Sequence, residues 1–209
     1  MDENWIERWE TGRTGWHEAR GNAGLKSHWR AQAGTVLVPF CGKTPDLVWL
    51  AQQGHNVTGI ELAEVAVRQF FAEQELAFTR EKGAALDCYR CSDLPIMLYC
   101  GDYFDFNGAA FDALYDRGAL VAVDPLRRAD YVEHTNRLLR PAAEILLITL
   151  EYDQDVVPGP PFALLPDELA TYWNDLERLE EKDDFDTCPP KFREAGLTDI
   201  KEVVWRSQR

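Results

Sequence analysis

Two positions in the segment from Val36 to Leu62, Gly42 and Glu61, have the residue types and the spacing of a nucleoside-binding site. The segment predicts a buried strand, a tight turn at Pro39–Lys43, an amphipathic helix and a second strand that closes on Glu61. In an open α/β sheet, the first strand–helix turn lies beside the tip of the second strand. A carboxylate at that tip, 19 positions past the glycine (61 − 42), can accept hydrogen bonds from both hydroxyls of a ribose. The simpler alternative is a solvated acid at a strand end.

The turn Pro39-Phe40-Cys41-Gly42-Lys43 restricts the kind of cofactor. It has one glycine, and it matches neither G-x-G-x-x-G nor the spacing of a phosphate-binding loop. Such a turn cannot wrap closely around a pyrophosphate, so it disfavours a dinucleotide such as NAD. S-adenosylmethionine has no phosphate, and its ribose, adenine, zwitterionic tail and sulfonium cation fit the pattern better.

Two more polar pairs follow predicted strands. Asp102 and Tyr103 come after the third strand, where Asp102 can accept the exocyclic amine of adenine and Tyr103 can cover the ring. The alternative is an acid that caps the following turn. Asp116 and Arg117 come directly after the fourth strand, and the carboxyl end of a parallel strand faces the ligand crevice. The alternative there is a salt bridge that closes the strand–helix turn.

Residues 1–30 carry four tryptophans among charged residues, and they precede the first strand. Trp5 and Trp9 are four positions apart, so a helix places them on one face. We expect this segment to be a lid whose rings, with Trp16, close over both ligands. Indole rings can also contact the sulfonium through a cation–π interaction. Plain packing of an N-terminal helix is the alternative.

The elements that position these residues alternate between strands and helices over the first 150 residues, which predicts a doubly wound, mostly parallel α/β sheet. The predicted strands lie at 35–38, 57–60, 96–100, 111–115 and 145–150. A polar loop or hairpin insertion is expected over 79–95 and a last long helix around Leu169–Trp173. Two edge strands are expected near 176–179 and 200–205.

Composition limits the class of protein. The chain has 209 residues, so we expect a single domain over 1–209, with a catalytic core at 31–209 behind the N-terminal lid. A net charge of −14 without a Lys/Arg run argues against a nucleic-acid partner. The longest aliphatic run is too short to span a bilayer, and the acidic N-terminus does not resemble a signal peptide. Five cysteines without a framework spacing predict reduced thiols in the cytoplasm, and the lone Cys88-x-x-Cys91 pair predicts no metal site.

Several strings together resemble the thiopurine S-methyltransferase family over nearly the whole chain. They are Pro39–Leu62 (PFCGKTPDLVWLAQQGHNVTGIEL), YDRGALVAV from Tyr115, ITLEYDQ from Ile148, PGPPF from Pro158, and the N-terminal WIERW and TGWH. The resemblance implies a class I methyltransferase with a seven-stranded, Rossmann-like sheet. It also implies transfer of the methyl group of S-adenosylmethionine to a sulfur nucleophile, with S-adenosylhomocysteine as the product, by a monomeric enzyme.

The resemblance also implies roles for particular residues. Trp16 stands where the family has an aromatic residue that covers the substrate. The cofactor-binding positions of the family are matched by Trp9, Phe40, Glu61 and Arg117. Its adenine-side position is matched by Asp102 and Tyr103. Together with Gly42 and Trp5, these complete the expected cofactor site. Phe40 in place of the usual leucine, and the stretch from Asp124 to Leu126, depart from the family pattern and can reshape the pocket.

For the chemistry, we expect Arg117 to stabilise an anionic sulfur and Asp116 to orient the arginine or take a proton. Phe162, in the rigid Gly-Pro-Pro loop, is expected in the far wall of the acceptor pocket. The favoured acceptor is a thiol or thione of a small aromatic or heterocyclic molecule. Two alternatives stay open: methylation of selenium or tellurium oxyanions, halide or bisulfide by the same fold, and a non-catalytic module that only binds the cofactor.

Overall fold

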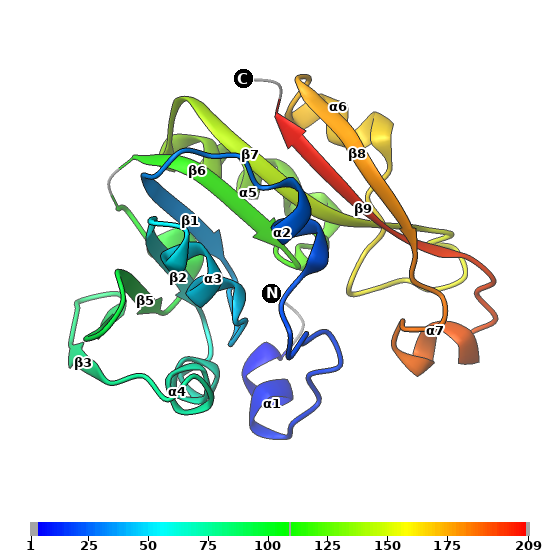
Figure 1. Cartoon of the computed structure of the whole chain (residues 1–209). Helices are drawn as coiled ribbons and strands as arrows, with labels where there is room; N and C mark the ends of the chain where they lie inside the picture. The colour runs from blue at the N-terminus through cyan, green and yellow to red at the C-terminus, as the bar shows by residue number, and fades with distance from the viewer. Residues whose placement is uncertain (1–3, 109, 208–209) are drawn as a thin grey trace.

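A computed structural model describes residues 4–108 and 110–207, and within them one nine-stranded sheet forms the centre of the molecule (Figure 1). The strand order is β3-β4-β5-β2-β1-β6-β7-β9-β8. The strands are β1 (Thr35–Pro39), β2 (Asn56–Glu61), β3 (Phe78–Glu81), β4 (Asp87–Cys91), β5 (Ile96–Cys100), β6 (Phe111–Arg117), β7 (Leu139–Tyr152), β8 (Leu176–Asp183) and β9 (Ile200–Ser207). The helices are α1 (Trp5–Glu10), α2 (Ala23–His28), α3 (Asp46–Gln52), α4 (Glu64–Glu73), α5 (Arg128–Leu138), α6 (Pro166–Tyr172) and α7 (Pro190–Glu194).

The five central strands are parallel, and the chain changes direction across the sheet at β1. From β1 the chain adds β2 on one side, and it later returns to add β6 on the other, with Val36 in register with both Val57 and Ala113. In open α/β sheets, ligands bind beyond the carboxyl ends of the strands where the order reverses. The ends of β1, β2 and β6 therefore define the expected site.

Alternation along β1 builds a layer of helices on each face of the sheet. Val36 and Val38 are buried against α2, α3 and α4, whereas Leu37 is buried against α5 and α6. Strands covered on both faces are apolar throughout, and this explains why the sequence pattern of the central strands is continuous rather than alternating. The predicted doubly wound α/β class is confirmed.

The predicted count of seven strands is wrong, because the insertion over 79–95 joins the sheet. Its hairpin, β3 and β4, pairs antiparallel with β5 through β4. Cys88 and Cys91 lie three apart on β4, so their side chains point to opposite faces. The backbone hydrogen bonds to β5 hold a polar strand that its sequence alone does not reveal.

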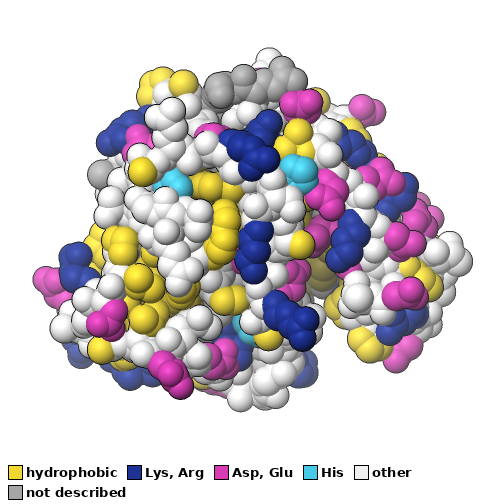
Figure 2. All heavy atoms as spheres, in the orientation of Figure 1, with side chains coloured by type: hydrophobic (Ala, Val, Ile, Leu, Met, Phe, Trp, Pro, Cys, Tyr) yellow, Lys and Arg dark blue, Asp and Glu magenta, His cyan; other side chains and the backbone are white. Residues whose placement is uncertain are grey.

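The C-terminal part differs from the prediction in two ways. Of the two predicted edge strands only β8 lies at an edge, since β9 lies between β7 and β8 and pairs antiparallel with both. The expected long helix is the short α6, and α7 follows β8. Along β8 the exposed side chains are mostly charged, and acidic side chains gather on that side of the molecule (Figure 2). Charge on an edge strand discourages pairing with other chains.

The N-terminal segment lies at the carboxyl edge of the sheet, where α1 packs beside α4 (Figure 1). On the other side of the same edge are α7 and the start of β9. The surface is hollowed between the N-terminal segment and the α7 side (Figure 2). No helix in residues 4–108 and 110–207 is both long and apolar enough to cross a membrane.

Candidate active site

The turn after β1 is built so that a backbone N–H faces the tip of β2. Phe40 and Gly42 both adopt positive φ, at 47° and 54°. This conformation directs the Gly42 N–H to Glu61 Oε2 at 2.8 Å. A Cβ on Gly42 would lie 2.9 Å from Cζ2 of Trp9, closer than such atoms pack. Glycine is therefore required here both by the backbone and by the indole ring that lies on it.

Glu61 is a buried carboxylate, 5% exposed, that both neighbouring turns hold in place. Its Oε2 accepts the N–H of Gly42, and its Oε1 accepts the N–H of Ala63 at 2.8 Å. Burial raises the pKa of Glu61, while these two N–H groups favour the charged form. A carboxylate offers about four acceptor positions, so the arrangement leaves capacity for the two hydroxyls of a ribose. The residues present therefore fit the ribose of S-adenosylmethionine.

Three tryptophan rings form a compact cluster over this turn. Trp16 packs edge-on against both Trp5 and Trp9, with ring centroids 5.2 and 5.7 Å apart. Trp9 is buried against Ala63 at the start of α4 as well as against Gly42. The guanidinium of Arg8 lies over the ring of Trp5, 5.3 Å from its centroid. The segment thus packs on the turn with Trp9 as its innermost ring, and closure of the rings over both ligands stays a prediction.

Arg117, at the end of β6, is joined to the N-terminal segment. Its guanidinium donates to the carbonyl oxygen of Trp16 at 2.6 Å and to the carboxylate of Glu18. The Arg117 side chain is 23% exposed. A residue far away in the sequence, Glu18, therefore contributes to the site. Glu18 lies two residues after Trp16 in the aromatic N-terminal segment. This position could have identified Glu18 as a site residue, but it was not among the predicted ones.

Asp116 does not contact the arginine beside it in sequence. Its Oδ1 accepts the N–H groups of Ala119 and Leu120 at 3.2 Å, and its Oδ2 accepts the Tyr131 hydroxyl at 2.7 Å. The carboxylate thereby fixes the turn that follows β6. We expected Asp116 to orient Arg117. In the structure the guanidinium is instead held by Glu18 and the carbonyl oxygen of Trp16.

Burial raises the pKa of Asp116 from 3.8 to about 6 in the folded protein. The folded state therefore binds more protons than the unfolded chain between about pH 4 and pH 6, and the free energy of unfolding falls as the pH rises through about 6. A shift of this size corresponds to about 3 kcal/mol. Burial also raises the pKa of Asp46, Glu61 and Glu202, which acts in the same direction.

We therefore expect the melting temperature to be higher at about pH 5.5 than at about pH 7.5, and Asp116→Asn to show a weaker dependence. Thermal unfolding followed by circular dichroism over this range measures both. The asparagine does not titrate, keeps the Oδ1 acceptor for Ala119 and Leu120, and places an amide N–H where it can donate to the Tyr131 hydroxyl. An identical slope in the two proteins would contradict the assignment to Asp116.

Asp102 and Tyr103 lie at the end of β5, with different surroundings. Asp102 is exposed and its Oδ1 accepts the N–H of Phe104 at 3.0 Å, so it does cap the short 3-10 helix η1 (Tyr103–Asp105). Tyr103 is buried, and its hydroxyl is bonded to Thr135 Oγ1 at 2.9 Å. Its ring packs edge-on against Phe40 at 5.6 Å. Tyr103 thus supports the turn after β1, and contact of either residue with adenine stays a prediction.

The loop that carries Phe162 is attached to the sheet from two sides. The N–H of Phe162 donates to the carbonyl oxygen of Val121 at 2.6 Å, after β6. The guanidinium of Arg128 donates to the carbonyl oxygen of Ala163 at 2.9 Å and to both oxygens of Glu168 at 2.8 Å. Arg128 is almost wholly buried and was not anticipated from the sequence. These contacts bring the loop alongside the turn after β6, and contact of Phe162 with an acceptor stays a prediction.

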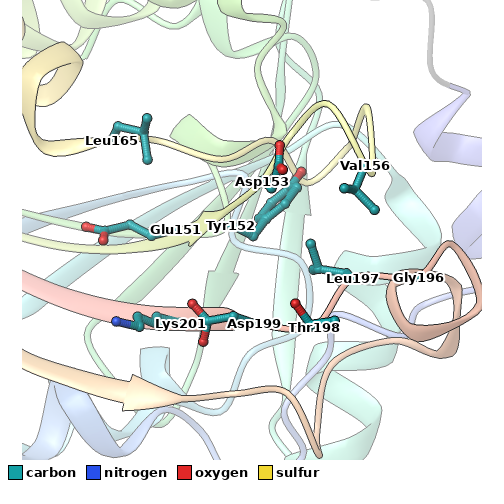
Figure 3. Close-up of a pocket in the computed structure, with 10 residues that line it drawn as sticks. All are labelled: Glu151, Tyr152, Asp153, Val156, Leu165, Gly196, Leu197, Thr198, Asp199 and Lys201. Carbon is teal, nitrogen blue, oxygen red and sulfur yellow. The ribbon is translucent and has the colours of Figure 1, made fainter.

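A separate cavity of about 260 Å³ lies beyond the end of β7, beside the start of β9 (Figure 3). None of its described lining residues belongs to the predicted cofactor or acceptor site; they are Glu151, Tyr152, Asp153, Val156, Leu165, Gly196, Leu197, Thr198, Asp199 and Lys201. Tyr152 links this cavity to the Phe162 loop, because its hydroxyl donates to the carbonyl oxygen of Pro161 at 2.6 Å. The predicted site residues Gly42, Glu61 and Arg117 lie instead at the ends of β1, β2 and β6.

The fold is shared with solved methyltransferases. The structure of 1,6-didemethyltoxoflavin-N1-methyltransferase from Burkholderia thailandensis, with 1,6-didemethyltoxoflavin and S-adenosylhomocysteine bound, superposes with a TM-score of 0.64 at 20% identity. The match covers 99% of this chain and 86% of the other. This likeness shows that the two chains share a fold, with a mostly parallel sheet covered by helices on both faces.

Sequence comparison places the chain more narrowly. The family model described as Thiopurine S-methyltransferase (TPMT) matches residues 1–209. A thiopurine S-methyltransferase of Bordetella petrii is 43% identical over 216 residues, covering 99% of this chain and 98% of its own. Another, from Pseudomonas fluorescens, is 43% identical and covers 97% and 96%. The chain belongs to the thiopurine S-methyltransferase family.

Proposed function

We propose that this enzyme transfers the methyl group of S-adenosylmethionine to the thiol or thione sulfur of a small aromatic or heterocyclic substrate. The observation that carries the proposal is the position of Arg117. Its partly exposed side chain lies at the end of β6 and is bonded to Trp16 of the N-terminal segment. Arg117 thus stands beside the strand-order reversal, where Glu61 and Gly42 form the proposed ribose site. A cation at this point can attract a soft anionic acceptor.

Glu61, Gly42 and Trp9 would hold the cofactor, with Phe40, Trp5, Asp102 and Tyr103 around it. When bound, S-adenosylmethionine supplies a methyl group that is already activated by its positive sulfur. What the protein must add is alignment and exclusion of water, and good alignment can supply roughly 7–11 kcal/mol. The tryptophan cluster and the Phe162 loop are suited to that task, because hydrogen bonds attach the first to Arg117 at the end of β6 and the second to Val121 just after it.

Arg117 is the residue that we assign to stabilisation of the acceptor sulfur. A thiol of low pKa reacts as a thiolate, so no strong base is required, and arginine keeps its charge throughout. Asp116 is a poor base in this arrangement, since donors from Ala119, Leu120 and Tyr131 already occupy both of its oxygens. We assign it to holding the turn after β6, and thereby the backbone of Arg117.

The five cysteines are free thiols in the structure, which supports our proposal that the enzyme works in the reducing cytoplasm. Two of them lie near the site without reactive character. Burial raises the pKa of Cys41 and raises that of Cys100 to about 11, so neither is a thiolate at neutral pH. The sulfur that takes the methyl group is therefore assigned to the substrate and not to the protein.

A turnover screen with labelled S-adenosylmethionine tests the proposed function. We expect label in aromatic thiols and thiopurines, and little in selenite, tellurite, iodide or bisulfide. Transfer to the inorganic acceptors alone would replace this function by the alternative methyltransferase activity. Calorimetric binding of S-adenosylmethionine without transfer to any acceptor would instead indicate a non-catalytic module.

A further inference from the structure

We propose that Glu18 is a specificity-determining residue: its carboxylate occupies Arg117 in the absence of acceptor, so an anionic acceptor must displace it. The inference rests on the proposed function, because it takes Arg117 as the group that faces the acceptor sulfur. Glu18 is bonded to the same guanidinium through one amino group, while the other amino group donates to the backbone of Trp16. The carboxylate thus stands where an acceptor anion would be bound.

The contacts of Glu18 tie it to a wider group of acids. The Asn22 side-chain amide donates to Glu18 Oε2 at 3.2 Å and to Glu202 at 3.3 Å. The backbone N–H of Asn22 donates to Asp46 Oδ1 at 2.9 Å. Three carboxylates from the N-terminal segment, β9 and α3 therefore surround one arginine. Asn22 is buried and links all three.

Other charged groups near this cluster have partners of their own. Lys43, in the turn after β1, is paired with Glu73 of α4 at 2.5 Å. His17 lies between the two pairs, and its burial, with Lys43 and Arg117 nearby, lowers its pKa, so it adds little positive charge at neutral pH. The balance of charge around Arg117 is therefore set mainly by Glu18, Glu202 and Asp46.

Glu18 is the member of the cluster that can move. Its side chain is 34% exposed, whereas Asp46 and Asn22 are buried and fixed by hydrogen bonds. When Glu18 stays on Arg117, the pair is neutral and favours an uncharged thione. When an ionised thiol binds, two anions compete for one guanidinium, and the thiolate must overcome that competition. The charge at residue 18 therefore sets the preference between ionised and neutral acceptors.

Glu18→Gln tests this, because it removes the charge but keeps an oxygen for Arg117 and an amide-sized side chain beside Asn22. We compare 4-nitrothiophenol, which is ionised at neutral pH, with 2-thiopyridone, a neutral thione. The KM of the thiolate is expected to fall about tenfold, which is about 1.4 kcal/mol, relative to that of the thione. Calorimetry with S-adenosylhomocysteine bound measures the Kd of the same two acceptors without turnover, and the same shift is expected.

The matched control is Glu202→Gln. It removes one charge from the same cluster. The hydrogen bond of Glu202 is to Asn22 and its electrostatic effect on Arg117 is weaker than that of Glu18, which bonds the guanidinium directly, so a much smaller shift is expected. An equal shift in both variants, an unchanged ratio of the two acceptors, or an equal loss of kcat/KM with both would each overturn the inference. Failure of the wild-type enzyme to methylate either compound would contradict the proposed function itself.

Discussion

Replacing Glu61 with alanine is expected to weaken the binding of S-adenosylmethionine at least tenfold. The carboxylate is held by Gly42 and Ala63 and is proposed to accept both ribose hydroxyls. A hydrogen bond to a charged group contributes about 1.5–3 kcal/mol, so the loss of even one exceeds a factor of ten. Isothermal titration calorimetry with S-adenosylmethionine and S-adenosylhomocysteine measures the effect directly.

Glu64→Ala is the matched control for this substitution. Glu64 is a nearby acid on α4, but its contacts are to Tyr89, Arg68 and Arg80, none of which is a predicted site residue. The Glu64→Ala variant loses the same charge outside the crevice, so we expect it to bind S-adenosylmethionine with wild-type affinity. Thermal melting of both variants checks that each is folded. Wild-type affinity in folded Glu61→Ala would exclude Glu61 as the ribose ligand.

The second large effect is expected for Arg117→Ala, which should lower kcat/KM for the thiol acceptor on the order of 100-fold. The guanidinium stabilises the acceptor sulfur and also joins the lid to β6 through Trp16 and Glu18. Arg117→Lys should recover part of the activity, because it keeps the charge but cannot bridge two partners with one planar group. Affinity for S-adenosylmethionine is expected to fall much less than kcat/KM.

Arg140→Ala serves as the control for a lost arginine. Arg140 lies near the amino end of β7 and pairs with Asp112 at the start of β6, on the opposite edge of the sheet from the site. Its kinetics should match those of the wild type. If Arg117→Ala kept full turnover with aromatic thiols, the assignment of the acceptor site to the end of β6 would be wrong.

The central part of the fold and the ribose site could be predicted because both depend on local sequence. Buried parallel strands such as β1 are continuous apolar runs, and they end at polar residues that the sheet brings to one edge. Glu61 and Gly42 lie at the ends of adjacent strands, so two local patterns suffice to place them together. The contact that the structure gives them, at 2.8 Å, follows from this register.

The contacts that the sequence did not predict join distant segments. A hairpin over 79–95 was one of two predicted alternatives, but its pairing with β5 through β4 was not predicted. Glu18 and Arg117 are 99 positions apart, and Arg128 and Glu168 are 40 apart. Charged residues of this kind are more often solvated than paired, so composition and spacing alone favour the wrong interpretation.

The insertion of β9 between β7 and β8 determines the order in which the enzyme can fold during synthesis. β8 leaves the ribosome before β9, yet its backbone partner in the sheet is β9. Until β9 is synthesised, β8 has no neighbouring strand to pair with and the edge of β7 is exposed. Exposed strand edges promote aggregation of nascent chains. The charged side chains along β8 therefore protect the growing chain as well as the finished molecule.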